Sequence, residues 1–240
     1  MSDLIRIDKF ISHSGLGTRA EVKKLLRKGL ITHKGNVIKD SGYKVLTDDH
    51  GVSYNGLLVT YESLVYIMLN KPKKVVSATK DNHDKTVMDL INHPMKDKLF
   101  PVGRLDKDTT GLLLITNDGK LSHELLSPRK HVDKSYIAKV IGIVNHETIK
   151  KFQEGVVLED NYKTMPSKLQ LLDQDEDTST VKITIKEGKY HQIKRMFISV
   201  SMKVIELKRI SMGSLELDKS LELGCYRPLT IEEIQSLETR

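Results

Sequence analysis

The chain is predicted to be an α+β protein whose larger part forms a mixed, mostly antiparallel sheet with helices on its faces. Segments with strand periodicity outnumber helical ones along the 240 residues. The two kinds do not alternate strictly, as a doubly wound fold would require. The first sixty residues instead predict helices followed by a hairpin. We therefore expect a small domain over residues 1–60 and a larger domain over residues 61–240.

Two helices and a hairpin are predicted for the small domain, over residues 7–14, 18–28 and 31–38. Apolar residues recur at helical spacing in the first helix, and a glycine follows its end. Thr18 and Glu21 fit a capping box at the start of the second helix. Gly29 fits the left-handed position that ends this helix.

The second helix carries a cluster of cations on the side away from its apolar stripe. Glu21 is the one acid among them, whereas an ordinary solvated face usually mixes both signs. The solvated face is the alternative, but unmatched like charge is better explained by phosphate groups. We therefore predict an RNA-binding face made of Arg19, Lys23, Lys24, Arg27 and Lys28.

The larger domain is predicted to contain short strands and helices after a polar linker at residues 60–63. Strands are expected over residues 64–69, 75–78, 112–115, 134–141 and 180–186. Helices are expected over residues 86–91, 121–126, 145–152 and 188–200, and from Thr230 onward.

Composition favours a polyanionic partner and a reducing environment. The net charge is +7, and the single cysteine, Cys225, excludes an intramolecular disulfide. The chain shows neither an apolar signal region nor an apolar run of membrane length, so we expect a cytoplasmic monomer with no membrane partner. Residues 15–20 match a dinucleotide-binding pattern, but a helix precedes them instead of the required strand. Metal-ligand pairs of the Cys-x-x-Cys or His-x-x-x-His type are also missing, so neither cofactor nor metal is expected.

The most informative segment is residues 101–119, where a carboxylate precedes a buried strand. Asp106 follows a turn-like lead-in, and the apolar strand of residues 112–115 comes after Gly111. A carboxylate in this place suits a nucleophile or a general base. The alternative is an aspartate that only caps a turn.

This segment resembles a specific family signature over its whole length. Residues 103–119 read Gly-Arg-Leu-Asp-x-x-Thr-x-Gly-Leu-Leu-Leu-x-Thr-Asn-Asp-Gly. That is the motif of the pseudouridine synthases related to ribosomal small subunit pseudouridine synthase A. Residues 4–50 resemble the S4-type (alpha-L) RNA-binding domain that precedes the catalytic domain in this family. The resemblance implies that Asp106 is the catalytic aspartate.

The resemblance also implies roles for residues outside the central segment. In the Tyr-His-Gln-Ile-Lys-Arg-Met motif of residues 190–196, the basic residue that pairs with the aspartate corresponds to Lys194, with Arg195 as second choice. Tyr136, in Lys-Ser-Tyr, corresponds to the tyrosine that lies against the target base. Arg104 would brace the RNA helix when the nucleotide flips out. Arg195 is also expected to contact RNA. The sequence departs from the family pattern at Thr110, Ser135 and Ser201.

The implied activity is isomerisation of a uridine to pseudouridine in 16S rRNA, with 16S rRNA or a small-subunit assembly particle as partner. The spelling of residues 190–195 and of residues 70–81 favours the small subunit over the large one. Two alternatives remain open: a relative that acts on 23S rRNA, and an RNA-binding assembly factor without catalytic turnover.

Overall fold

A nine-stranded sheet organises most of the chain in this computed structural model, which describes residues 2–61 and 64–239. The chain divides into two units. The first comprises the described residues up to Val65 together with 91–99, and the second comprises 66–90 and residues from 100 onward. The predicted linker at 60–63 includes residues 62 and 63, which lie outside the described residues.

The first unit contains two helices packed with short strands. Helices α1 and α2 span Ile7–His13 and Arg19–Arg27. Thr18 and Glu21 form both halves of the predicted capping box, and Gly29 has the predicted positive φ, 72°. Ile7, Phe10 and Ile11 of α1 and Val22 and Leu26 of α2 are fully buried, while Leu25 is partly buried. The predicted hairpin is confirmed as β2 (Ile31–His33) with β3 (Asn36–Val37), which joins β5 (Val52–Tyr54) and β6 (Leu57–Leu58), while β1 (Leu4–Arg6) pairs with β4 (Lys44–Leu46).

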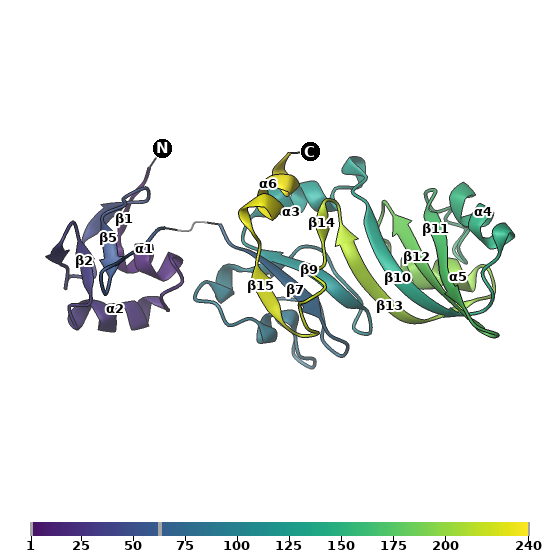
Figure 1. Cartoon of the computed structure of the whole chain (residues 1–240), viewed down its shortest axis with the longest axis horizontal. Coiled ribbons are helices and arrows are strands. Elements are labelled where there is room, and N and C mark those ends of the chain that lie inside the picture. The colour runs from purple at the N-terminus through teal and green to yellow at the C-terminus, as the bar shows by residue number, and fades with distance from the viewer. Residues whose placement is uncertain (1, 62–63, 240) are drawn as a thin grey trace. The chain divides into compact units, whose positions relative to one another are not determined.

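The second unit is built on one sheet with the strand order β11-β12-β10-β13-β9-β7-β15 (Figure 1). Strands β8 and β14 add to β9 and β13. Every pairing is antiparallel except that of β9 with β13, so the predicted mixed, mostly antiparallel sheet is confirmed. The strands are β7 (Tyr66–Lys71), β8 (Phe100–Pro101), β9 (Thr110–Thr116), β10 (Lys134–Ile141), β11 (Lys168–Gln174), β12 (Thr178–Ile185), β13 (Lys203–Met212), β14 (Leu215–Glu216) and β15 (Tyr226–Pro228).

Helices cover both ends of this sheet (Figure 1). Helices α3 (Gly119–Leu126) and α6 (Ile231–Glu238) bury Leu121 and Leu237 in one core cluster with β7 and β9. Helices α4 (His146–Glu154) and α5 (Gln192–Ile198) meet through Phe152 and Phe197, whose ring centroids lie 4.9 Å apart. Short 3₁₀ turns lie at Val87–Leu90, Lys96–Lys98 and Pro128–Lys130. In the described part of the chain, none of the helices has the length and apolarity needed to span a bilayer.

One predicted strand is wrong and one predicted helix is shorter than expected, and each difference affects the site. Residues 75–78 form no strand, because Val76 makes only an isolated bridge and the Ser77 hydroxyl bonds the backbone of Leu105. The helix expected from residue 188 begins only at Gln192, because His191 has a left-handed backbone with φ 48°. Residues 188–191 are therefore a loop.

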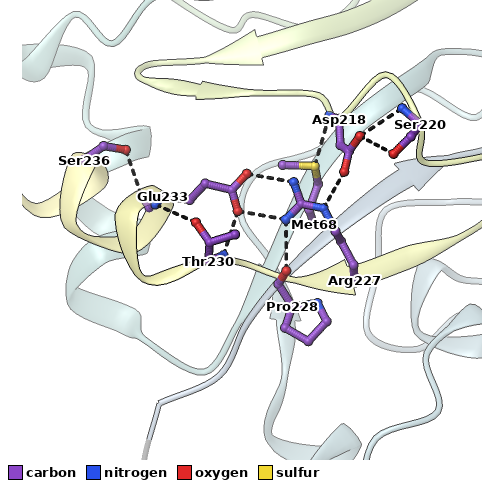
Figure 2. Close-up of polar contacts among 8 residues, drawn as sticks. All are labelled: Met68, Asp218, Ser220, Arg227, Pro228, Thr230, Glu233 and Ser236. Carbon is purple, nitrogen blue, oxygen red and sulfur yellow. Dashed lines mark hydrogen bonds and ion pairs between the residues drawn. The ribbon is translucent and has the colours of Figure 1, made fainter.

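The C-terminal end of the chain is fastened to the sheet by Arg227 on β15 (Figure 2). Its guanidinium contacts Asp218 at 2.7 Å and both oxygens of Glu233 at 2.8 Å. Hydrogen bonds from Ser220 and from Arg227 lower the pKa of Asp218 to about 2. Glu233 also accepts the amide of Thr230 in the predicted capping box of α6, so one arginine joins a strand, a loop and a helix.

Gly111 allows the parallel pairing of β9 with β13. It lies opposite Arg209 with φ +100°, and a Cβ atom there would lie 2.2 Å from the Arg209 carbonyl oxygen. That oxygen belongs to the backbone of the central sheet and has little freedom to move.

We expect Gly111→Ala to lower the free energy of unfolding by on the order of 3 kcal/mol, from strain at positive φ and from the clash. Denaturant unfolding measures the change. Gly119→Ala is the matched control, because it opens α3 and nothing lies within 4 Å of its Cβ position. A Gly111→Ala protein as stable as Gly119→Ala would contradict this account of the pairing.

Candidate active site

The loop that carries Asp106 joins β8 to β9, and its backbone is hydrogen-bonded by Lys71, the last residue of β7. Lys71 is fully buried. Its ammonium donates to the carbonyl oxygens of Asp106 at 3.0 Å, Thr109 at 2.9 Å and Pro72 at 3.0 Å. A protonated lysine has three N–H donors, so all three are used. Both ends of the Asp106–Thr109 turn are thereby fixed to the sheet.

Burial lowers the pKa of Lys71 to about 8, although the charges of Asp108 and Asp106 oppose the shift. The amine is therefore mostly protonated at neutral pH, and it loses a proton in mildly alkaline solution. Ser77 supports the same loop, since its hydroxyl donates to the Leu105 carbonyl at 2.9 Å and accepts the Leu105 amide at 3.0 Å.

The Asp106 carboxylate faces two basic side chains, one on α5 and one on the residue that precedes this helix. Its Oδ2 atom lies 3.2 Å from Lys194 Nζ, and its Oδ1 atom lies 3.7 Å from His191 Nε2. The side chain of Asp106 is 28% exposed, so it is partly open to solvent. The structure therefore brings Asp106 and Lys194 together, and it leaves the carboxylate reachable by a ligand.

Lys194 is shared between two carboxylates. Its ammonium contacts Asp108 at 2.6 and 2.9 Å, closer than it lies to Asp106. Burial alone would lower the pKa of Lys194, but the hydrogen bonds and charges of Asp108 and Asp106 outweigh that effect and raise it. Burial raises the pKa of Asp108, but the hydrogen bond and charge of Lys194, together with smaller contributions from a backbone hydrogen bond and from His191, bring it below its usual value. A charged ammonium is thus maintained next to Asp106.

Two adjoining cavities open at Asp106. The narrower one, of about 80 Å³, is lined by Asp106, Tyr136, Arg104 and Lys194 among others. Its volume is far below that of a site for a drug-sized ligand, so it can take only a small group. The wider cavity, of about 450 Å³, shares Arg104 and Asp106 and extends past Tyr190. Tyr136 is buried on β10 and Arg104 is exposed on the loop, so both predicted residues line the cavity with Asp106.

A partly buried polar network fixes the loop that precedes α5. Gln192 donates to Glu187 at 2.7 Å and accepts the Lys189 amide at 2.9 Å. Glu187 also accepts the Tyr162 hydroxyl at 2.6 Å. Because Gln192 opens α5, these bonds set the position of the helix that carries Lys194.

Arg195, the second choice as partner for Asp106, points elsewhere. Its guanidinium contacts Glu159 at 2.5 Å and Asp160 at 2.6 Å. An RNA contact by Arg195 would have to compete with these two carboxylates.

The five cations of α2 are all exposed, but they are not equivalent. Arg19 contacts both oxygens of Asp8, at 2.9 and 3.0 Å, and the Asp8 carboxylate is completely buried. The expectation of a cluster without matching acids is therefore wrong for Arg19, because its acid lies on the other helix. Within residues 2–61 and 64–239, no ion pair is formed by Lys23, Lys24, Arg27 or Lys28.

Sequence reasoning did not assign roles to Lys71, Asp108 or His191. A signal existed for Lys71, since a lysine two residues after the apolar strand of residues 64–69 and directly before a proline is unusual in a buried segment. Asp108 and His191 carried no comparable signal, because their importance depends on the loop conformations.

Two family models match the chain. The model described as RNA pseudouridylate synthase matches residues 65–199, and the S4 domain model matches residues 5–50. A solved structure, a pseudouridylate synthase, superposes with a TM-score of 0.68 at 37% identity, covering 97% of this chain and 99% of that one.

Several proteins are similar over nearly the whole length. An uncharacterised RNA pseudouridine synthase of Bacillus subtilis, YtzG, is 44% identical over 97% of this chain and 98% of its own. Ribosomal small subunit pseudouridine synthase A of Salmonella typhimurium is 40% identical over 97% and 100%. Ribosomal large subunit pseudouridine synthase B of Bacillus subtilis is 38% identical over 97% and 95%.

Proposed function

Because the chain belongs to the RNA pseudouridylate synthase family, we propose that it converts one uridine of 16S ribosomal RNA to pseudouridine, with Asp106 as the catalytic residue. The observation that carries the proposal is the contact of 3.2 Å between Asp106 and Lys194 at a cavity that Tyr136 also lines. The S4 domain is proposed to supply a second RNA contact, and the protein is proposed to act as a cytoplasmic monomer.

The reaction is an isomerisation that breaks one bond and forms another. The bond between N1 of uracil and C1′ of ribose breaks, and a bond between C5 and C1′ replaces it. The C5 proton is released, and N1 gains a proton. Asp106 starts this sequence as an ionised carboxylate, either by attacking the nucleoside or by removing a ribose proton. Neither route changes the redox state, so the proposed reaction uses no cofactor.

The other residues hold the reactants in place. Lys194 stabilises the ionised Asp106, and its own charge is secured by Asp108. Tyr136 lies against the uracil in the narrow cavity, while Arg104 braces the RNA at the position that the flipped nucleotide leaves. RNA phosphates are proposed to be contacted by seven basic residues, namely Arg104, Lys23, Lys24, Arg27, Lys28, Arg19 and Arg195.

Two observations support the small ribosomal subunit as the source of the substrate: the sequence of residues 190–195 and 70–81, and the similarity to relatives named for the small subunit. Identity alone separates the alternatives weakly, since the relatives named for the small and the large subunit are 40% and 38% identical. The experiment must therefore include both RNAs.

Tritium release from RNA labelled at C5 of uridine tests the proposal, because only C5-to-C1′ bonding expels this proton. Purified protein is incubated with 16S transcript, 23S transcript and assembled small-subunit particles. We expect stoichiometric release of one tritium per 16S molecule, as free RNA or particle. Release from 23S transcript alone would favour the large-subunit alternative. Binding without release from any substrate would favour an assembly factor without turnover.

A further inference from the structure

A strongly exposed aromatic residue lies beside the active site and has no part in the mechanism above. Tyr190 keeps 78% of its surface exposed. Single exposed apolar residues are common on protein surfaces, so exposure alone assigns no role. The surroundings of Tyr190 supply the argument.

The ring of Tyr190 is stacked on the imidazole of His191. Their centroids lie 3.9 Å apart, and their planes differ by 18°. His191 adopts a left-handed backbone, which is uncommon for residues other than glycine, and its Nε2 atom lies 3.7 Å from Asp106 Oδ1. The two rings therefore form a stack, in which the His191 ring lies next to the catalytic carboxylate and the exposed Tyr190 ring offers an aromatic surface.

This surface borders the wider cavity, of about 450 Å³. Three cations line the same cavity, namely Arg104, Lys107 and Lys189. Lys189 is held in place by the ring of Tyr162, 4.6 Å from its ammonium. Aromatic surface combined with a cationic groove is the chemistry that binds single-stranded nucleic acid, where rings stack on bases and cations contact phosphates.

We propose that Tyr190, backed by His191, is a stacking platform for the base next to the target uridine in the same RNA strand. The inference rests on the proposed function, because the flipped uridine must occupy the narrow cavity at Asp106. A neighbour of a flipped nucleotide loses one stacking partner, and a protein ring placed beside it restores that partner. The platform thus fixes the register of the strand, so that one uridine and not the next reaches Asp106.

Kinetics on the rRNA substrate test the platform without any assumption about which neighbour stacks. We expect Tyr190→Leu to raise KM about tenfold and to leave kcat within about twofold, since stacking on an aromatic ring contributes to binding and not to the chemical step. Tyr190→Phe should restore most of the lost affinity, because it keeps the ring. If the hydroxyl carried the effect, Tyr190→Phe would raise KM as much as Tyr190→Leu does, and that result would overturn the proposal.

An abasic substitution identifies the stacked neighbour. The probe is a fluorescein-labelled RNA nonamer with a single central uridine among adenosines, compared with versions that lack the base on the 5′ or the 3′ side. One of the two abasic versions should lower the affinity of the wild-type protein as much as Tyr190→Leu lowers affinity for the intact RNA. The affinity of the Tyr190→Leu variant should be the same for that abasic version as for the intact RNA. Equal additional losses for both abasic versions would overturn the proposal.

The two claims fail in different ways. If the wild type releases no tritium from any rRNA, the proposed function fails. If the wild type releases tritium and Tyr190→Leu shows the wild-type KM, only the platform fails.

Discussion

Replacing Asp106 by asparagine is expected to abolish pseudouridine formation, with a loss of at least about 10⁴-fold in kcat. The amide has nearly the shape of the carboxylate, but it carries no charge and is neither an effective nucleophile nor a base at neutral pH. RNA affinity should stay the same or rise slightly, because the substitution removes a negative charge near the phosphates and leaves the cations of α2 untouched. Tritium release measures turnover, and filter binding measures affinity.

Asp108→Asn is the matched control, two residues away on the same loop. It removes an equivalent charge and one partner of Lys194, but it leaves the contact of 3.2 Å between Lys194 and Asp106 available. We expect this variant to keep activity within about tenfold of the wild type. If Asp106→Asn and Asp108→Asn lost the same amount of activity, the assignment of Asp106 rather than Asp108 as the catalytic residue would be contradicted.

Replacing Lys71 by methionine is expected to have the second largest effect, although Lys71 does not face the cavity. The substitution removes the ammonium donor from the carbonyl oxygens of Asp106, Thr109 and Pro72, although Asp106 still accepts the Thr109 amide at 3.1 Å. Unpaired buried acceptors cost about 1–3 kcal/mol each, and relief from burying a charge offsets part of this. We therefore expect a loss of about 2–4 kcal/mol in the free energy of unfolding and about 10²-fold in kcat, because the loop no longer fixes Asp106.

Lys73→Met separates this role from a general effect of removing positive charge. Lys73 is exposed in the loop that follows β7, and the same substitution there should change stability by less than about 0.5 kcal/mol. Denaturant unfolding and tritium release are measured on both variants. A Lys71→Met protein with the stability and kcat of Lys73→Met would show that the three carbonyls do not depend on this ammonium.

The pKa of Lys71, about 8, also predicts how activity and stability depend on pH. Above pH 8 the neutral amine keeps only two N–H donors for three carbonyls, so kcat should fall as pH rises through about 8. The free energy of unfolding should instead rise with pH over this range. The folded state binds this proton less tightly than the unfolded state, so the cost of burying the charge is full below pH 8 and shrinks as pH approaches 10.5. If the fall of kcat above pH 8 were unchanged in Lys71→Met, this fall would have to come from the titration of another group.

The sequence predicted most elements whose periodicity is local. The strand at residues 134–141 and the helices near Leu121 and His146 appear where apolar spacing and caps place them. The strand of residues 203–212 was missed, although it is the longest of the described sheet. Its place between β9 and β10 is set by pairing with distant segments, which no local pattern displays.

The site was predicted from motif resemblance and not from local chemistry. Asp106, Tyr136 and Lys194 lie far apart in the sequence, and only the fold brings them to one cavity. What the motif did not indicate is the support beneath and beside them. The buried ammonium of Lys71 and the sharing of Lys194 with Asp108 depend on tertiary contacts between separate loops. The left-handed conformation of His191, which makes the predicted helix begin late, likewise depends on tertiary structure at the site.

The most direct test of the central claim, that the Asp106 carboxylate isomerises a uridine of 16S rRNA, is a pseudouridine map of ribosomal RNA. The map compares cells that lack this protein, cells complemented with the wild type, and cells complemented with Asp106→Asn. We expect one 16S position to lose pseudouridine in the deletion and to regain it with the wild type alone. Recovery of that position by Asp106→Asn, or 16S and 23S maps unchanged by the deletion, would contradict the account.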